Sequence, residues 1–205
     1  YRRCIFTDGF DVFFQGDPFT TDFSEQNIYF TLENETNNLL NESYFSKFPD
    51  FYQIICSQNI INCGVFAGGT SLLFTFFTYY LQMFPGLIGI WSQTKNYHEP
   101  YSDQDALNYF VYVWMPNNNN NLYNQIVFLP SASRFSSMIG EIRYSNPNTV
   151  WTFPNFSIFS DVEQKMIKPL LVHQYTYKSQ IVHSLIDSCG LLSHQKSVKL
   201  YYRLR

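Results

Sequence analysis

The chain has 205 residues, enough to bury a substantial core, and 45% of them are hydrophobic, with 21 Phe and 16 Tyr. This aromatic content excludes a disordered chain, which contains few aromatic residues. The formal net charge is −3 and only 14% of the residues are charged, so the sequence lacks the basic surface that nucleic acids and anionic membranes attract.

The first predicted elements are two strands. Residues 3–8 (RCIFTD) form an apolar run that ends in an acid, as a buried strand does. Residues 27–34 (NIYFTLEN) alternate apolar and polar side chains and predict a half-buried strand. Because a domain rarely begins directly with a core strand, we expect an N-terminal part to be missing before Tyr1. The Asn-rich residues 34–50 predict a surface connection.

A strand followed by a helix is predicted in a stretch without charges. Residues 60–69 (IINCGVFAGG) indicate a strand that ends in a glycine turn, and residues 70–84 a helix with Thr70 or Ser71 as its cap. Residues 51–94 contain no Asp, Glu, Lys or Arg, and residues 65–84 are long enough to span a membrane. The glycines, Thr, Ser and Tyr of this stretch favour a buried strand–turn–helix, with a membrane anchor as the alternative.

The second half of the chain continues the alternation of helices and strands. The predicted elements are a helix at 102–115 with Ser102 as N-cap, a low-complexity surface loop at 116–121 (PNNNNN), strands at 125–130 and 168–175, and a helix at 177–189. This order predicts an α/β fold in which one mixed sheet is flanked by helices, with residues 1–205 forming a single domain.

Cysteines and glycosylation sequons bear on the compartment. The four cysteines, at positions 4, 56, 63 and 189, show no CxxC pair, so a zinc site is not expected, while a disulfide stays open. Three Asn-x-Ser/Thr sequons, at Asn34, Asn41 and Asn155, favour a secretory compartment.

Asp8 and Asp11 form an acid pair directly after the first predicted strand. Asp is common in turns, which explains the pair without any function. Open α/β sheets also bind ligands at the carboxyl ends of their strands, where two carboxylates can share a divalent cation. Such a cation could neutralise a diphosphate as it leaves. From these residues alone, a nucleotide-diphosphate enzyme and a plain metal site are both open.

Four blocks in chain order carry a resemblance. They are TDGFDVFFQGDPF at 7–19, NCGVFAGG at 62–69, DQDALNYFVY at 103–112 and VHQY at 172–175. Together they resemble a group of eukaryotic glycosyltransferase-like proteins with the GT-A fold, whose typical blocks are DxRDVxFQxDPF, a glycine turn before a helix, DQxxxNxLxY and VHQYDR. The four blocks are spread over residues 7–175, which is most of the chain, and jointly they are far more specific than any one of them.

The resemblance implies a metal site. Asp8 and Asp11 would hold Mn²⁺ or Mg²⁺ against the diphosphate of a sugar nucleotide, and His173 would complete the site from the last strand. An imidazole ligand suits Mn²⁺ better than Mg²⁺. Taken alone, His173 is better explained as a histidine of the core, and only together with the acid pair does it become the favoured ligand.

The resemblance also implies a sugar site. Asn62, Gly64 and Gly68 would form the loop under the sugar, where glycine lets the backbone approach a ligand; a strand-to-helix turn with positive φ explains the same glycines. Asp103 and Gln104 would lie near the donor sugar or the acceptor hydroxyl. Asp103 would be the general base of an inverting reaction, or simply a first-turn acid favoured by the helix dipole.

Some residues depart from the family pattern. Phe10 replaces the arginine between the paired acids, and Thr176 and Tyr177 replace the acid and arginine that follow VHQY. The family's N-terminal half, which holds the nucleobase and ribose, is not in the sequence.

The sequence therefore predicts a GT-A-like fragment of a metal-dependent glycosyltransferase that moves a sugar from a nucleotide-diphosphate donor to a glycan or protein acceptor. We expect it in the Golgi or ER lumen, attached to a membrane only through a missing N-terminal anchor, and without nucleic-acid partners. The alternatives are a catalytically inactive glycosyltransferase-like binding protein and a membrane protein anchored by residues 65–84.

Overall fold

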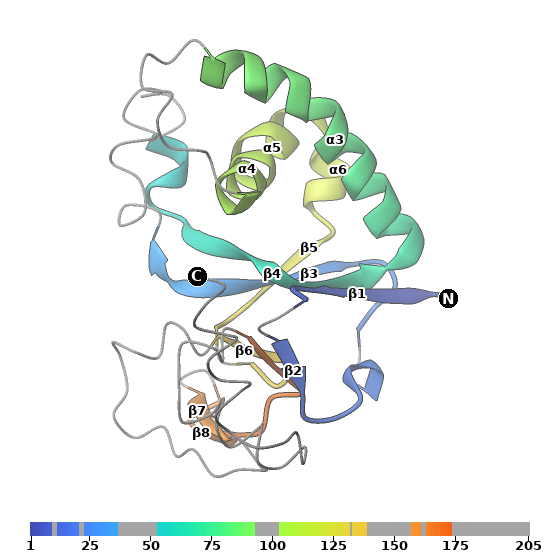
Figure 1. Ribbon diagram of the computed structural model, residues 1–205, viewed down its shortest axis with the longest axis vertical. Coiled ribbons are helices and arrows are strands. Elements are labelled where there is room, and N and C mark those ends of the chain that lie inside the picture. The colour runs from blue at the N-terminus through green and yellow to red at the C-terminus, as the bar shows by residue number, and fades with distance from the viewer. Residues whose placement is uncertain are drawn as a thin grey trace, which may run out of the picture. The chain divides into compact units, whose positions relative to one another are not determined.

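The computed structural model describes residues 1–9, 12–20, 23–36, 53–92, 103–131, 133–138, 157–160 and 163–173. The chain divides into two compact units (Figure 1). The first unit comprises Tyr1–Asp8 and Phe19–Ser131, and the second comprises Gly9–Pro18 and Ala132–Arg205. The elements are β1 (Arg3–Thr7), β2 (Val12–Phe14), the short helix η1 (Pro18–Thr20), β3 (Ile28–Thr36), β4 (Asn59–Gly69), α3 (Thr70–Ser92), α4 (Asp103–Tyr109), the π-helical segment η2 (Phe110–Trp114), α5 (Met115–Asn118), α6 (Asn120–Tyr123), β5 (Ile126–Leu129), β6 (Ser136–Met138), β7 (Ile158–Ser160), β8 (Lys165–Ile167) and β9 (Leu171–His173).

The first unit is built on a four-stranded mixed sheet with the order β1-β4-β3-β5. Strand β4 is antiparallel to both β1 and β3, and β5 is parallel to β3. The strands β1, β3 and β5 therefore run in the same direction, and their carboxyl ends lie at one edge of the sheet, which we call the carboxyl edge. The predicted α/β class with a mixed sheet and helices is confirmed.

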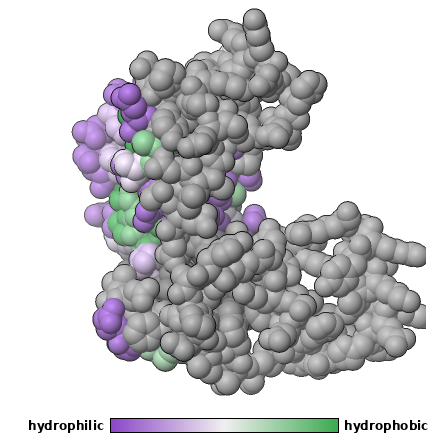
Figure 2. All heavy atoms as spheres, turned by 90° about the vertical axis from the view of Figure 1, so that its left-hand side faces the viewer, coloured by the Kyte–Doolittle hydropathy of each residue, from purple (hydrophilic) through white to green (hydrophobic). Residues whose placement is uncertain are grey.

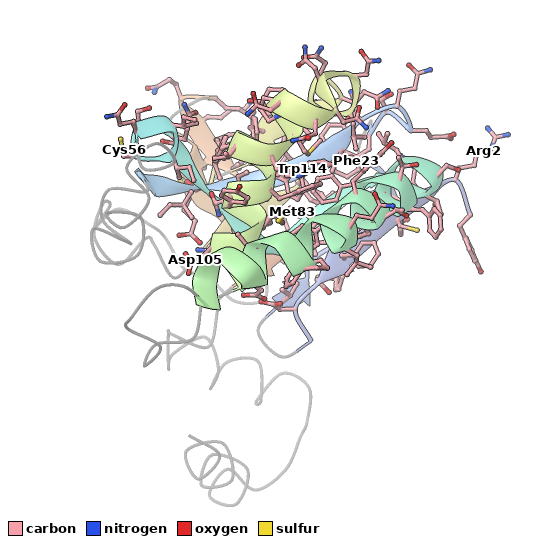
Figure 3. All side chains as sticks on the ribbon, turned by 90° about the horizontal axis from the view of Figure 1, so that it is seen from above. Arg2, Phe23, Cys56, Met83, Asp105 and Trp114 are labelled. Carbon is pink, nitrogen blue, oxygen red and sulfur yellow. The ribbon has the colours of Figure 1, made fainter. Side chains whose placement is uncertain are left out.

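The core of this unit lies between the sheet and its helices, which cover one face of the sheet in Figure 1. Ile28 and Phe30, two residues apart on β3, point to the same face and are fully buried. Phe76 of α3 and Phe110 of η2 meet them there, with their ring centroids 5.0 Å apart. In Figure 3, Met83 and Trp114 lie within this helix layer, while Arg2 and Cys56 lie at opposite ends of the unit.

Strand β4 is followed by α3, which confirms the predicted order of strand and helix, but the predicted glycine turn between them is wrong, because β4 extends through Gly69 and α3 starts at the next residue. The helix starts at Thr70, one of the two predicted cap positions, and extends through Pro85 to Ser92, eight residues past its predicted end. Proline removes the bond to the carbonyl of Leu81, but both residues are exposed, so water can satisfy that carbonyl. None of the helices in the described ranges is long and apolar enough to cross a membrane.

The predicted helix at 102–115 is confirmed in outline by α4 and η2, but the loop predicted at 116–121 is wrong, because this run forms most of α5 and the start of α6. Its asparagines bond locally to the helix backbone. The amide of Asn117 donates to the carbonyl of Val113 at 2.7 Å, and the Asn119 side chain accepts from the Leu122 N–H at 3.2 Å as the N-cap of α6. Buried Leu122 anchors this short helix to the core.

The second unit contains two small sheets, β2-β9-β6 and β7-β8. The strand predicted at residues 168–175 is confirmed in part, because β9 occupies Leu171–His173 of this range. Arg134 binds the carboxylate of Glu163 at 3.0 Å on the surface, and Lys165 joins this pair at 3.1 Å. The helix predicted at 177–189 and most of the connection predicted at 34–50 lie outside the described residues.

Candidate functional site

Most of the predicted site residues of the first unit come together at the carboxyl edge of the sheet. Asp8 directly follows β1, and its backbone N–H donates to the carbonyl of Gly64 on β4 at 2.8 Å. Asp8 and Asp103 both act electrostatically on the thiol of Cys63, which places the two carboxylates around this residue. In Figure 3, Asp105 marks the first turn of α4, to which Asp103 also belongs.

A bulge in β4 shapes this edge. The register moves from Phe30 opposite Phe66 to Leu32 opposite Ile61, so β4 takes five steps where β3 takes two. The extra residues include Asn62, Cys63 and Gly64. A bulge re-aims side chains and peptide groups away from the regular ladder, and bulges are common beside active sites.

Asn62 organises the hydrogen bonds of the bulge. Its side-chain Nδ2 donates to Oε1 of Glu33 on β3 at 2.8 Å, and its Oδ1 accepts from the N–H of Gly64 at 2.8 Å. Asn62 is 1% exposed and Glu33 is 8% exposed. A buried carboxylate needs hydrogen-bond donors, so the amide of Asn62 stabilises Glu33 and is itself held in one orientation.

The start of α4 approaches the same bulge. Oε1 of Gln104 accepts from the N–H of Cys63 at 3.4 Å and from Nδ2 of Asn62 at 3.5 Å. The carboxylate of Asp103 accepts from the N–H of Gln104 at 2.9 Å, as expected of a first-turn acid. Asp103 is nevertheless exposed, so its carboxylate also faces solvent beside the bulge.

Two acidic groups give the site a negative field. Burial raises the pKa of the Cys63 thiol well above its ordinary value, and the negative charges of Asp103 and Asp8 raise it further. Burial also raises the pKa of Tyr80, with Asp103 as the next cause. Cys63 therefore stays a neutral thiol at physiological pH and is not a nucleophile. Such a field suits a bound cation or the hydroxyl groups of a ligand.

Gly68 lies away from this cluster. Asn62, Gly64 and Gly68 all belong to β4, so the loop predicted from them is wrong: they lie in one strand. Gly68 pairs with Cys4 of β1 and Ile28 of β3, and its φ is outside the left-handed region that the turn interpretation requires. A Cβ there would lie 2.8 Å from the carbonyl oxygen of Asn27, so close backbone packing explains this glycine.

His173 belongs to the second unit. It ends β9, is 2% exposed, and lies between Val12 of β2 and Met138 of β6 in the register of that sheet. Asp11, which precedes Val12 in the sequence, lies outside the described residues. Within the described ranges, no three or more His, Cys, Asp or Glu side chains are grouped to hold a metal. The ligand set of Asp8, Asp11 and His173 stays a prediction.

Three residues of the site were missed by sequence reasoning. Glu33 looks like the polar side of an alternating strand, and only the structure shows that its carboxylate is buried against Asn62. Cys63 carries no motif of its own. Asn108 lies four residues after Gln104 in the DQDALN block, a spacing that places both on one helix face, and this signal could have identified it.

No family model, curated protein or solved structure matches the chain. The fold class therefore rests on the sheet and its helices, and the site on the contacts at the carboxyl edge. Together they describe an α/β protein whose acidic, amide-rich candidate site lies at the carboxyl ends of the strands, where open α/β sheets commonly bind ligands.

Proposed function

We propose that this chain is a metal-dependent glycosyltransferase of the GT-A kind that moves a sugar from a nucleotide-diphosphate donor to a glycan or protein acceptor in a secretory compartment. The observation that supports this proposal most is the meeting of three separate sequence blocks at one edge of one sheet. Asp8 comes from the first block, Asn62 and Gly64 from the second, and Asp103 and Gln104 from the third.

The residues of the first unit suit the chemistry of a sugar ligand. Exposed Asp103 can accept a hydrogen bond, and then a proton, from the hydroxyl group of an acceptor. The amide of half-buried Gln104 is a hydrogen-bonding group that the bulge already holds in place, so it loses little freedom when a ligand binds. Asn62 is buried and already bonded to its neighbours, so it would support Gln104 and not contact the ligand itself.

The residues also fit a hard divalent cation. Asp8 presents an exposed carboxylate at the end of β1. The negative charges of Asp8 and Asp103, which add to the effect of burial on the pKa of Cys63, favour a positive charge there. Mn²⁺ or Mg²⁺, when bound, would offset the charge of a leaving diphosphate. Asp8, Asp11 and His173 would hold it, as the sequence resemblance implies.

Isothermal titration of the full chain with UDP and with GDP, each in the presence of Mn²⁺, tests the proposal. We expect binding that Asp11→Ala or Asp8→Asn weakens at least about tenfold, because each removes a charged ligand. Glu25→Gln is the matched control, since Glu25 is a surface carboxylate that precedes β3, away from the carboxyl edge.

The titration also separates this proposal from its alternatives. Nucleotide binding that survives both Asp variants would contradict the metal site. A folded chain that binds neither nucleotide would instead support a catalytically inactive relative that binds glycans or proteins.

A further inference from the structure

One face of the helix formed by α4 and η2 carries three polar side chains that bond to the backbone of β4. Gln104, Asn108 and Tyr112 follow each other at intervals of four residues. They reach, in that order, the N–H of Cys63 at 3.4 Å, both main-chain groups of Ile61, and the carbonyl of Asn59 at 2.7 Å.

The spacing of the two elements explains this pattern. Four residues of α-helix rise about 6 Å, and two residues of a strand advance about 6.6 Å, so a helix antiparallel to a strand can place every fourth side chain against every second strand residue. Gln104 and Asn108 face Cys63 and Ile61 in this way. The helix thus bonds to the start of β4 along its length.

Asn108 makes the central contact. Its Oδ1 accepts from the N–H of Ile61 at 2.8 Å, and its Nδ2 donates to the carbonyl of Ile61 at 3.0 Å and to that of Gln104 at 2.8 Å. A neighbouring strand residue exchanges the same two bonds with its partner in an antiparallel ladder. β1 ends opposite Val65 and does not extend to Ile61, so one asparagine takes the place of a strand there.

We propose that Asn108 is a positioning residue: by replacing a strand neighbour of Ile61, it holds the bulge at Asn62–Gly64 against the start of α4, where Asp103 and Gln104 lie. Asn108 is 1% exposed and acts through these neighbours. Its importance for sugar transfer rests on the proposed function, but its effect on the geometry of the edge does not.

Only an amide satisfies all of these groups. Leucine has a similar size but leaves the N–H and the carbonyl of Ile61 without partners in a buried place. Asn118 offers a matched control on the same helical stretch, because its amide donates to the carbonyl of Trp114 at 2.7 Å, four residues earlier, on the surface.

Amide hydrogen exchange of the full chain, measured by NMR, tests the proposal without any nucleotide. We expect Asn108→Leu to accelerate exchange at Ile61, Cys63 and Gly64 by at least about tenfold, which is the effect of one lost buried hydrogen bond, while Ala67 of the same strand stays unchanged. We expect Asn118→Leu to change neither region.

A second readout follows the thiol beside Asp103. Alkylation of Cys63 by N-ethylmaleimide, followed by peptide mass spectrometry, is expected to become at least about tenfold faster in Asn108→Leu, because the start of α4 no longer holds against the bulge. Cys4, whose Sγ contacts the hydroxyl of Thr70 at 3.2 Å, is the internal reference and should keep its rate.

The outcomes decide the proposal in either direction. Equal acceleration at Ile61 and Ala67 would mean that Asn108 supports only overall stability, and unchanged exchange at both would mean that it holds nothing; either overturns the proposal. If Asn108→Leu does not fold, Asn108→Ser decides, because the shorter side chain keeps a polar group but does not reach both main-chain groups of Ile61. Acceleration confined to residues 59–64 supports the proposal, and a uniform change or none overturns it.

Discussion

Strand β4 has a strand on each side at residues 66–68, whereas at residues 59–64 it has β3 on one side and the side chains of α4 and η2 on the other. The first region forms a regular ladder in which glycine allows tight backbone packing. The second is bulged and polar, and buried amides hold it. One strand thus provides both the centre of the sheet and the candidate site. The two regions differ in the partners of their backbone N–H and C=O groups, which are strands in the first region and, on one side, helix side chains in the second.

The largest expected effect breaks the regular region. A Cβ at Gly69 would overlap the main chain of Glu25, which cannot move aside as a flexible side chain could. We expect Gly69→Ala to lower the free energy of unfolding by about 3 kcal/mol or more, measured by urea denaturation. Gly86→Ala is the control, because its Cβ would meet nothing within 4 Å in α3, and it should stabilise by about 0.5–1 kcal/mol. Equal stability of the two variants would contradict the close packing.

The next prediction breaks the bulged region. Asn62→Leu removes the amide that binds the buried carboxylate of Glu33, and we expect it to lower the free energy of unfolding by about 2–4 kcal/mol. Asn121→Leu, at an exposed position of α6, should stay within about 0.5 kcal/mol of the wild type in the same urea titration. A loss no larger than that of the control would show that Glu33 does not depend on Asn62.

The third prediction sharpens the comparison through pH. The folded state raises the pKa of Cys63, so its contribution to stability is complete below 9.0, the ordinary value, and is lost as the pH rises above it. Between pH 9 and 10, we expect the wild type to lose up to about 1.4 kcal/mol more stability than Cys63→Ala. Urea titrations at each pH measure this difference, and Cys56→Ala controls for the loss of a thiol. Parallel pH profiles for wild type and Cys63→Ala would contradict the raised pKa of Cys63, which burial causes first and the charges of Asp103 and Asp8 increase.

The smallest expected effect lies outside β4, at the N-cap of α6. It gives the stability contribution of a single local hydrogen bond, with which the effects in β4 can be compared. Asn119→Ala removes the acceptor for the Leu122 N–H at the start of α6, and we expect a loss of about 1 kcal/mol in thermal unfolding. Asn120→Ala, exposed in the next position, should have a smaller effect. If both variants unfold at the same temperature as the wild type, the cap contributes nothing to stability.

The sequence predicts the positions of strands and helices better than it predicts the contacts between them. Strands β1, β3 and β4 and the start of α3 follow from local patterns of apolar residues, because such patterns reflect which face is buried. The asparagine run was predicted wrongly, since its composition is that of a loop while its side chains bond within the helix. The end of α3 was also missed, because proline usually stops a helix but is tolerated at an exposed position.

The candidate site could be predicted only as a set of residue names. Residues 60–69 read as one continuous strand, and no local pattern shows that the register slips between Ile61 and Phe66. The burial of Glu33 and the double bond of Asn108 to Ile61 depend on segments far apart in the chain. Long-range pairing of this kind leaves no periodic signal.

The parallel pairing of β3 with β5 joins Ile28 to Ile126 and so closes a very long loop. During translation, β5 is synthesised only after most of the first unit, so β3 lacks this neighbour until then. The unpaired backbone N–H and C=O groups on that side of β3 can meanwhile pair with strands of other chains. Folding of this unit should accordingly be slow and sensitive to truncation before residue 129.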